Sequence, residues 1–244
     1  MLAGWGSPFR QNGGMPDTQA VVFDFYNTLA APHADDFWSR LPGLVAAAGG
    51  EMEGRALEDW ERLQPEEHLE HSTSEAAYRA WQARRLEALL EQCGVPRAAH
   101  AGIVAEIEDV RYTRLFQVFP DVADVLADLR DRGLMVGICS NWDWDLERHL
   151  RHNRIHDLID FFVCSAIHGH RKPHPAIFAT VIDQAGVPAE RIVFVGDSLS
   201  DDIAGSMRAG LRPVHIARHH ACPPDGHDGV ACLPDLHGLA ALIA

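Results

Sequence analysis

Apolar and polar positions follow two different patterns along the chain. From residue 118 to the end, short apolar runs alternate with amphipathic segments that have helical spacing. The runs predict strands at 134–140, 160–165, 191–196, 212–217 and 229–233, and the amphipathic segments predict helices at 121–133, 143–153, 175–186, 201–210 and 234–244. Because the runs are short and almost wholly apolar, they are typical of a parallel sheet covered by helices on both faces.

A further apolar run, AVVF at 20–23, stands apart from the others. Between it and residue 118 lies a stretch rich in Ala, Glu, Arg and Leu, with helical periodicity and no strand signal. The clearest helix runs from Ser74, a good N-cap residue, to Gly94, a residue type that often ends helices. The sequence therefore predicts an all-helical segment inserted after the first strand of the sheet.

These patterns predict an α/β fold, a doubly wound parallel sheet with an inserted all-helical domain. We expect a loose N-terminal tail over residues 1–18, an α/β core formed by 19–30 together with 118–244, and a helical insert over 31–117. A chain of 244 residues, 47% of them hydrophobic and 23% charged, is long enough for such a core with a smaller insert.

The net charge of -14 argues against non-specific binding of nucleic acid, which requires a basic surface. An anionic ligand must therefore be held by a local positive feature, since the overall field repels it. The chain has no apolar run of the length needed for a signal peptide or a membrane span, so we expect no membrane partner. Nothing in the sequence indicates an oligomeric state.

The five cysteines are scattered, and two of them, Cys139 and Cys164, lie inside apolar runs. Such cysteines are typical of small core residues, which predicts a reduced, cytoplasmic protein. Histidines and cysteines also gather near the C-terminus, at His215, His219, His220, Cys222, His227 and Cys232. This group lacks the paired short spacings of a structural zinc site, so the sequence does not predict one there.

Polar side chains follow the predicted strands at their carboxyl ends, where open α/β sheets build their sites. These residues are Asp24 after the first strand, Ser140 and Asn141 after the second, Lys172 in the loop after the third, and Asp197 and Asp202 after the fourth. A carboxylate at the end of an apolar strand is costly to desolvate, which favours a functional role for Asp24. The set provides a nucleophile, a cation-binding carboxylate pair and donors for a phosphate.

Lys172 stands out because it is the only lysine in the chain, whose other long basic side chains are all arginine. A compact ammonium and a planar guanidinium are not interchangeable at a tight site. A chain that otherwise uses arginine has kept this one lysine directly before a proline, which favours a specific role over a solvated surface position.

In this order, the motifs resemble those of the haloacid dehalogenase-like hydrolase superfamily. The family's first motif, Asp-x-Asp-x-Thr, is similar to DFYNT from Asp24, and its second, a Ser or Thr closing a strand, is similar to GICSN at Ser140. Its lysine motif is similar to RKPHP at Lys172, and its Gly-Asp motif with a later acid falls on Asp197 and Asp202. The helical insert resembles the family's helical cap, which closes over the site and selects substrates.

The resemblance implies a phosphatase mechanism. Asp24 would form a covalent aspartyl intermediate that water then hydrolyses. It implies an Mg²⁺ ion bound by Asp24, the backbone carbonyl of Tyr26 and Asp197, with Asp202 as a further ligand or as the residue that orients Lys172 or metal-bound water. Ser140, Asn141 and Lys172 would bind the phosphoryl group of a small phosphomonoester.

Tyr26 departs from the family's phosphatase pattern, which has an aspartate at this position as the acid and base. Tyrosine is a poor base at neutral pH, although its carbonyl can still bind a metal. The tyrosine is similar to that of metal-independent 2-haloacid dehalogenases, whereas Asp197 favours the metal-dependent phosphatases because a second carboxylate beside Asp24 needs a cation. A catalytically weak ligand-binding protein is the third alternative. Asn27 stands where glycine is common, and asparagine tolerates unusual backbone angles.

Several other residues are weaker candidates for contact with a substrate. Trp142 and Trp144 follow Ser140 directly, and packing is the more common role for such side chains. In the insert, His68, His71, Arg84 and Arg85 could reach a substrate, but we expect each of them to lie on the surface.

Overall fold

The computed structural model of the chain describes residues 17–31, 37–53, 56–57, 60, 64–113, 115–223, 226–227 and 229–243. Residues 1–16 of the predicted N-terminal tail lie outside these ranges. All the residues predicted for the site lie within them.

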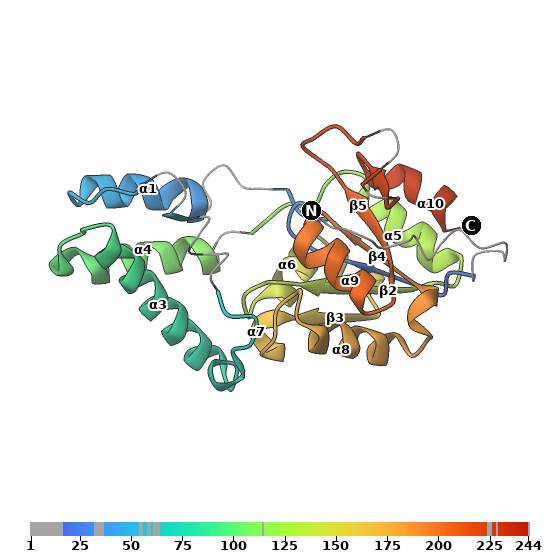
Figure 1. The fold of residues 1–244 in the computed structure, drawn as a ribbon, viewed down its shortest axis with the longest axis horizontal. Coiled ribbons are helices and arrows are strands. Elements are labelled where there is room, and N and C mark those ends of the chain that lie inside the picture. The colour runs from blue at the N-terminus through green and yellow to red at the C-terminus, as the bar shows by residue number, and fades with distance from the viewer. Residues whose placement is uncertain are drawn as a thin grey trace.

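A parallel sheet of six strands, in the order β3-β2-β1-β4-β5-β6, forms the centre of the core (Figure 1). The strands are β1 (Ala20–Phe23), β2 (Met135–Ser140), β3 (Phe161–Cys164), β4 (Ile192–Gly196), β5 (Arg212–Ile216) and β6 (Ala231–Leu233). The predicted doubly wound sheet is therefore confirmed. Strand β1 lies between β2 and β4, with Ala20 opposite Met135 on one side and Ile192 on the other.

Alternate residues of the strands face two separate apolar layers, as the side-chain period of two requires. Val21 and Phe23 belong to the cluster that contains α5 (Val122–Asp131), α6 (Leu146–His152) and α10 (Leu239–Leu242). Ala20 and Val22 belong to the cluster on the other face, with α8 (Pro175–Ala185). All four of these β1 side chains are fully buried, so the strand that leads to Asp24 is held from both faces.

The remaining elements of the core are short. They are η2 (His156–Leu158), α7 (Ser165–His168), η3 (Ala189–Arg191), the π-helical turn η4 (Leu199–Ile203), α9 (Ala204–Arg208) and η5 (Leu236–Gly238). The helix predicted over 201–210 is thus wrong in its first turn, because Ser198 caps a π-helical turn by accepting a hydrogen bond from Asp201 N. Such wide turns often occur at functional sites.

The inserted segment is helical in its described residues, with α1 (Phe37–Ala47), η1 (Leu69–His71), α3 (Glu75–Gln92) and α4 (Arg97–Thr113). Figure 1 shows α1, α3 and α4 as a lobe beside the sheet. Ser74 caps α3 as predicted, accepting a hydrogen bond from Ala77 N. The lobe has its own apolar cluster, which includes Leu41, Leu90 and Ile107.

The two chain segments that connect the lobe to the core run side by side. Ala31 N donates to Gln117 O at 2.8 Å, and Phe119 N donates to Leu29 O at 2.9 Å. The domain boundaries at residues 30/31 and 117/118 stay a prediction. The hydrogen bonds show that the two connecting segments lie next to each other.

The cysteines differ in part from the sequence prediction. Cys139 and Cys164 are buried and free, as expected, but a disulfide joins Cys222 to Cys232, which departs from the fully reduced state that the cysteine pattern predicts. A cytoplasmic location stays a prediction. Among the described residues, no helix combines the length and the apolar character needed to cross a membrane.

Candidate active site

The carboxyl ends of β1 and β2 bring Asp24 and Ser140 together. Asp24 directly follows β1, and its backbone N–H donates to Val195 O of the neighbouring strand at 2.8 Å. Ser140 is the last residue of β2, and its Oγ donates to Asp24 Oδ1 at 2.9 Å. Both side chains are buried, so the hydrogen bond between them lies in an environment with little water.

Lys172 links two of the predicted acids. Its Nζ donates to Asp24 Oδ1 and to Asp202 Oδ1, both at 2.6 Å, and its side chain is only 2% exposed. Asn141 holds the backbone of Lys172, because Lys172 N donates to Asn141 Oδ1 at 2.7 Å and Asn141 Nδ2 donates to Lys172 O at 3.0 Å. Asn141 therefore acts on the site by positioning Lys172.

The ammonium of Lys172 is held in its charged form. Burial by itself lowers the pKa of this side chain, but the carboxylates of Asp202 and Asp24 raise it more, and on balance the pKa lies above its usual value. A fixed positive charge in a buried site is the local feature that an acidic protein needs to bind an anionic substrate.

Asp202 approaches the strand end through a space that only glycine leaves open. A Cβ on Gly196 would lie 2.4 Å from the carboxyl group of Asp202. Asp202 Oδ2 accepts a hydrogen bond from Ser198 N at 3.0 Å, while its Oδ1 accepts from Lys172. Both oxygens of Asp202 are thus already engaged in positioning the lysine and the loop after β4.

The site contains more negative than positive charge. Carboxylate oxygens of Asp24, Asp197 and Asp202 lie within 4.8 Å of one another, around the single ammonium of Lys172. Burial and the neighbouring charge of Asp24 raise the pKa of Asp197 to about 7. Because the donors are oxygens and their charges repel, the set fits a hard divalent cation such as Mg²⁺.

The Tyr26 side chain packs among aromatic rings. Its ring lies edge-on to Phe116, with centroids 5.8 Å apart, and tilted against Trp142 at 6.2 Å. The adjacent Asn27 has a φ of 57°, in the left-handed region that asparagine tolerates better than most residues. The backbone turn after Asp24 therefore depends on the residue type at position 27.

One set of contacts that supports this turn was not predicted from the sequence. Arg218 Nε and Nη2 donate to Thr28 O at 3.1 and 2.9 Å, and its Nη1 donates to Asp121 Oδ2 at 2.8 Å. Burial acts to raise the pKa of Asp121, but hydrogen bonds from Arg218 and Leu236 N lower it below its usual value. Arg218 and Asp121 are far apart in the sequence and match no motif, so only the fold reveals this support.

The prediction that His68 lies on the surface is wrong. His68 is 2% exposed and stacks on Trp81, with ring centroids 5.1 Å apart. It is buried because this part of the insert contacts the core, where His68 N donates to Gly169 O at 2.7 Å. Its Nε2 lies 3.1 Å from Ser165 O, and burial lowers the pKa of its imidazole to about 4. His71 also stacks on Trp81, with ring centroids 4.8 Å apart.

The two arginines of α3 have different environments. Arg84 is exposed, as predicted. Arg85 is half-buried, with its guanidinium 4.3 Å from the ring centroid of Trp60 and Nη1 donating to Gln82 Oε1 at 2.8 Å. These contacts of Arg85 lie within the lobe.

Trp142 and Trp144 pack in different places. Trp142 lies edge-on to Phe25 and Phe116, with centroids 5.0 and 5.2 Å apart, so it fills the core beside the site. Trp144 lies against Tyr78 of α3, with centroids 6.3 Å apart, at the contact between insert and core. Packing therefore accounts for both rings.

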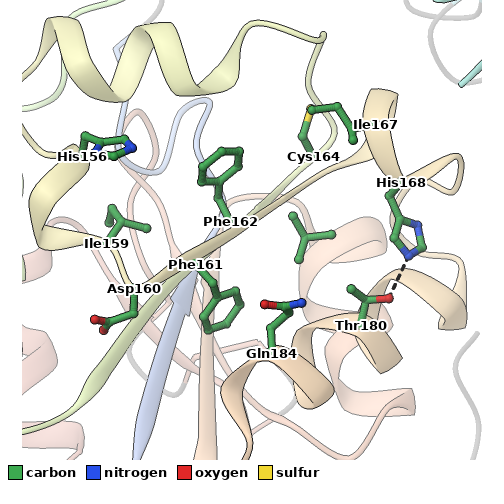
Figure 2. A pocket seen from close by; sticks show the side chains of 11 residues that line it. His156, Ile159, Asp160, Phe161, Phe162, Cys164, Ile167, His168, Thr180 and Gln184 are labelled. Atoms are coloured by element: carbon green, nitrogen blue, oxygen red, sulfur yellow. Dashed lines mark hydrogen bonds between the residues drawn. The ribbon is translucent and has the colours of Figure 1, made fainter. Parts of the chain in front are cut away.

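A hollow of about 480 Å³ lies along the edge strand β3 (Figure 2). Residues of β3, α7 and α8 line it, among them Phe161, Ile167, His168 and Thr180. His168 Nε2 lies 2.8 Å from Thr180 Oγ1 across one side. None of the residues predicted for the site lines this hollow, so it does not change the assignment of the site.

Known proteins resemble this chain in both sequence and structure. A family model described as haloacid dehalogenase-like hydrolase matches residues 18–210. The chain is 34% identical to a glyceraldehyde 3-phosphate phosphatase of Methanopyrus kandleri over 142 residues, which are 55% of this chain and 59% of that protein. It is 33% identical to the pyrimidine 5′-nucleotidase YjjG of Escherichia coli over 110 residues, or 44% and 49% of the two chains. The chain thus spans about half to three-fifths of the length of these relatives.

Solved structures match over nearly the whole length. A 2-haloacid dehalogenase from Pseudomonas syringae pv. Tomato DC3000 superposes with a TM-score of 0.64 at 26% identity, covering 93% of this chain and 98% of that one. A predicted phosphoglycolate phosphatase from Haemophilus somnus superposes with a TM-score of 0.69 at 16% identity, covering 95% and 100%, and this likeness concerns the fold alone.

Proposed function

Because the chain belongs to the haloacid dehalogenase-like hydrolases, we propose that it is a phosphatase that hydrolyses a small phosphomonoester through Asp24. The observation that carries this proposal is the buried contact of Lys172 with both Asp24 and Asp202, at 2.6 Å each. This contact supports the proposal because a buried cation lies beside the carboxylate that would act as the nucleophile, and transfer of an anionic phosphoryl group needs such a cation.

The first step is attack by the Asp24 carboxylate on phosphorus. The bond between phosphorus and the leaving oxygen breaks, and an aspartyl phosphate remains. The phosphoryl oxygens replace Asp24 as the acceptors for Ser140 Oγ and Lys172 Nζ, which point at Asp24 in the structure. Water then hydrolyses the acyl phosphate, which releases inorganic phosphate and restores the carboxylate.

Asp24, the carbonyl of Tyr26 and Asp197 would hold the Mg²⁺ ion. When bound, the ion supplies positive charge that offsets the repulsion between the carboxylates and the anionic substrate. We assign Asp202 to positioning Lys172, since both oxygens of Asp202 already accept hydrogen bonds. A metal-ligand role for Asp202 stays the alternative, because its carboxylate belongs to the same acidic group.

The second candidate is a metal-independent 2-haloacid dehalogenase. Tyr26 favours it, as does the likeness to the Pseudomonas syringae dehalogenase. In that reaction Asp24 attacks carbon, the carbon–halogen bond breaks and halide leaves. Asp197 counts against this candidate, because without a cation it places a further carboxylate beside Asp24.

A substrate panel tests the two candidates together. The purified chain is incubated with aryl, acyl and alkyl phosphates and with chloroacetate, each with Mg²⁺ and with excess EDTA, and phosphate and chloride release are measured. We expect Mg²⁺-dependent phosphate release, faster with the better leaving groups because Tyr26 is a weak acid. Chloride release that persists in EDTA would establish the dehalogenase instead. Tight phosphate binding without turnover would indicate a ligand-binding protein.

A further inference from the structure

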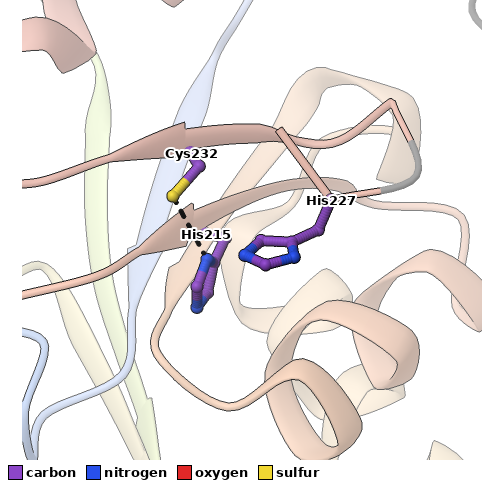
Figure 3. Close-up of side chains that lie close together, drawn as sticks. All are labelled: His215, His227 and Cys232. Atoms are coloured by element: carbon purple, nitrogen blue, oxygen red, sulfur yellow. Dashed lines mark hydrogen bonds between the residues drawn. The ribbon is translucent and has the colours of Figure 1, made fainter. Parts of the chain in front are cut away.

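A cluster of nitrogen and sulfur side chains lies at the β5–β6 side of the sheet. His215 and Cys232 are register partners on these two parallel strands, and Cys232 Sγ lies 3.4 Å from His215 Nδ1. Figure 3 shows His227 beside them, its ring edge-on to that of His215 with centroids 4.7 Å apart. One ligand atom from each of these three residues lies within 4.8 Å of the other two.

Cys222 adds a fourth donor, since its sulfur is joined to that of Cys232. Two thiolates and two imidazoles form the ligand set of many structural zinc sites, with Zn–S distances of about 2.3 Å and Zn–N distances of about 2.0–2.1 Å. In a tetrahedron of that size the ligand atoms lie about 3.3–3.8 Å apart. The ligand atoms of His215, His227 and Cys232, which lie within 4.8 Å of one another, therefore need only small movements to reach that spacing. The Cys222 sulfur can take the fourth position once its bond to Cys232 is broken.

The orientation of His215 distinguishes this cluster from a chance grouping. His215 is buried, and its Nε2 lies 3.0 Å from the backbone carbonyl of Asp197, which is an acceptor. The proton of the neutral ring is therefore on Nε2, and the lone pair is on Nδ1, which faces the Cys232 sulfur. Histidines that bind metals usually have such a carbonyl or carboxylate partner on the other ring nitrogen.

The backbone near His227 is also fixed. His227 N donates to Val230 O at 3.1 Å, and Val230 N donates to His227 O at 2.9 Å. Gly226 has a φ of +71°, and a Cβ there would lie 2.0 Å from Val230 O, so only glycine fits. This turn holds His227 close to Cys232. Cys222, His227 and Cys232 are half-buried, which leaves the cluster accessible to an ion.

We propose that His215, Cys222, His227 and Cys232 bind one Zn²⁺ ion when the disulfide is reduced. A thiol or phosphine reductant supplies two electrons that break the S–S bond, and two protons complete the thiols. Zinc then replaces both protons and forms two Zn–S and two Zn–N bonds. Cys222 and Cys232 can therefore either form the disulfide or bind zinc, but not both. The bound ion would hold the connection between β5 and β6 against the sheet.

Metal binding by the reduced protein tests this proposal. The full-length chain is reduced with a phosphine, stripped with EDTA and dialysed against Zn²⁺ or Co²⁺. We expect one tightly bound zinc per chain by elemental analysis, and a cobalt spectrum with thiolate charge-transfer and tetrahedral bands. Cys222→Ser and Cys232→Ser should each lower the affinity at least about 100-fold. Asp24→Asn should keep the cobalt spectrum, because the oxygen ligands of the acidic site produce no thiolate band.

Two controls keep the result specific. Cys93→Ser removes a buried free cysteine of the insert, and His219→Ala removes an exposed histidine outside the ligand set, and both should bind zinc normally. If the serine variants fail to fold, alkylation of the two accessible thiols in the native reduced protein should abolish the thiolate band. Reduced wild-type protein that shows two reactive thiols but takes up no zinc would overturn the proposal, as would zinc binding that survives Cys232→Ser.

Discussion

The core and the helical insert use their buried polar groups in different ways. In the core, Lys172 contacts Asp24 and Asp202 directly, so buried charges face one another. In the insert, the buried side chains of Gln82 and His68 contact aromatic residues instead: Gln82 Nε2 donates to Tyr78 Oη at 2.9 Å, and His68 stacks on Trp81. We therefore expect substitutions in the core site to change turnover, and substitutions in the insert to change stability and substrate choice.

The largest effect should come from Asp24→Asn. Removing the nucleophile should lower turnover of an aryl phosphate by at least about 1000-fold at every Mg²⁺ concentration. Asp124→Asn, the same change at an exposed position of α5, is the matched control and should have no comparable effect. Substantial turnover by folded Asp24→Asn protein would contradict the assignment of catalysis to this site in the core.

Lys172→Arg should lower kcat by about 100-fold or more. The planar guanidinium cannot place one nitrogen 2.6 Å from both carboxylates in a space built for a compact ammonium. Arg171→Lys, the reciprocal change at the preceding residue, serves as the control and should keep most of the activity. Comparable kcat values for the two variants would show that Lys172 is not specific to the reaction.

Asp197→Asn should affect the metal more than the chemistry. Losing one charged ligand should raise the Mg²⁺ concentration for half-maximal turnover by about 10–100-fold, and excess Mg²⁺ should restore part of the rate. The titration is compared with that of Asp183→Asn, an exposed residue of α8. An unchanged Mg²⁺ requirement would contradict the assignment of Asp197.

His68 tests the insert through the pH dependence of stability. Burial lowers the pKa of this imidazole from 6.5 to about 4, so between these pH values the unfolded chain binds a proton that the folded chain does not. The free energy of unfolding should therefore fall as the pH decreases through this window, by about 1–3 kcal/mol from this group. His68→Gln, which keeps a donor toward Ser165 O, should show a shallower decrease in denaturant unfolding. If the free energies of unfolding of the wild type and of His68→Gln decrease in parallel as the pH falls, His68 is not the cause.

Tyr26→Phe should have the smallest effect, within about threefold in kcat. The ring packs against Phe116 and Trp142, and the carbonyl assigned to the metal does not depend on the side chain. Tyr26→Asp should raise the rate on alkyl phosphates by supplying the missing acid. A loss of about 100-fold or more in Tyr26→Phe would instead identify the hydroxyl as a proton donor.

The parts of the molecule that repeat a physical pattern could be predicted from the sequence. Short apolar runs predicted all six strands, and their polar ends predicted the contacts of Asp24 with Ser140 and Lys172, because parallel strands deliver their carboxyl ends to one edge. The burial of His68 could not be predicted, since it depends on how the insert packs on the core. The same holds for Arg218, which reaches Thr28 from the far end of the chain.

The Cys222–Cys232 pair shows another limit. Zinc motifs are found in sequences by short, regular spacings, whereas these donors come from two strands and the connection between them. Their proximity follows from the register of β5 and β6, in which His215 lies opposite Cys232. A sequence pattern records separation along the chain, and register is a property of the folded sheet.

The place of β1 in the sheet has a consequence for how the chain is made. This strand is synthesised first, yet its partners, beginning at Met135 and Ile192, leave the ribosome only after the whole insert. Until then its apolar side chains have no sheet to join, and such segments are prone to aggregate. The lobe, whose apolar cluster lies between β1 and β2 in the sequence, can fold during this delay. Nascent-chain lengths that end before residue 192 should therefore be the ones that depend most on chaperones.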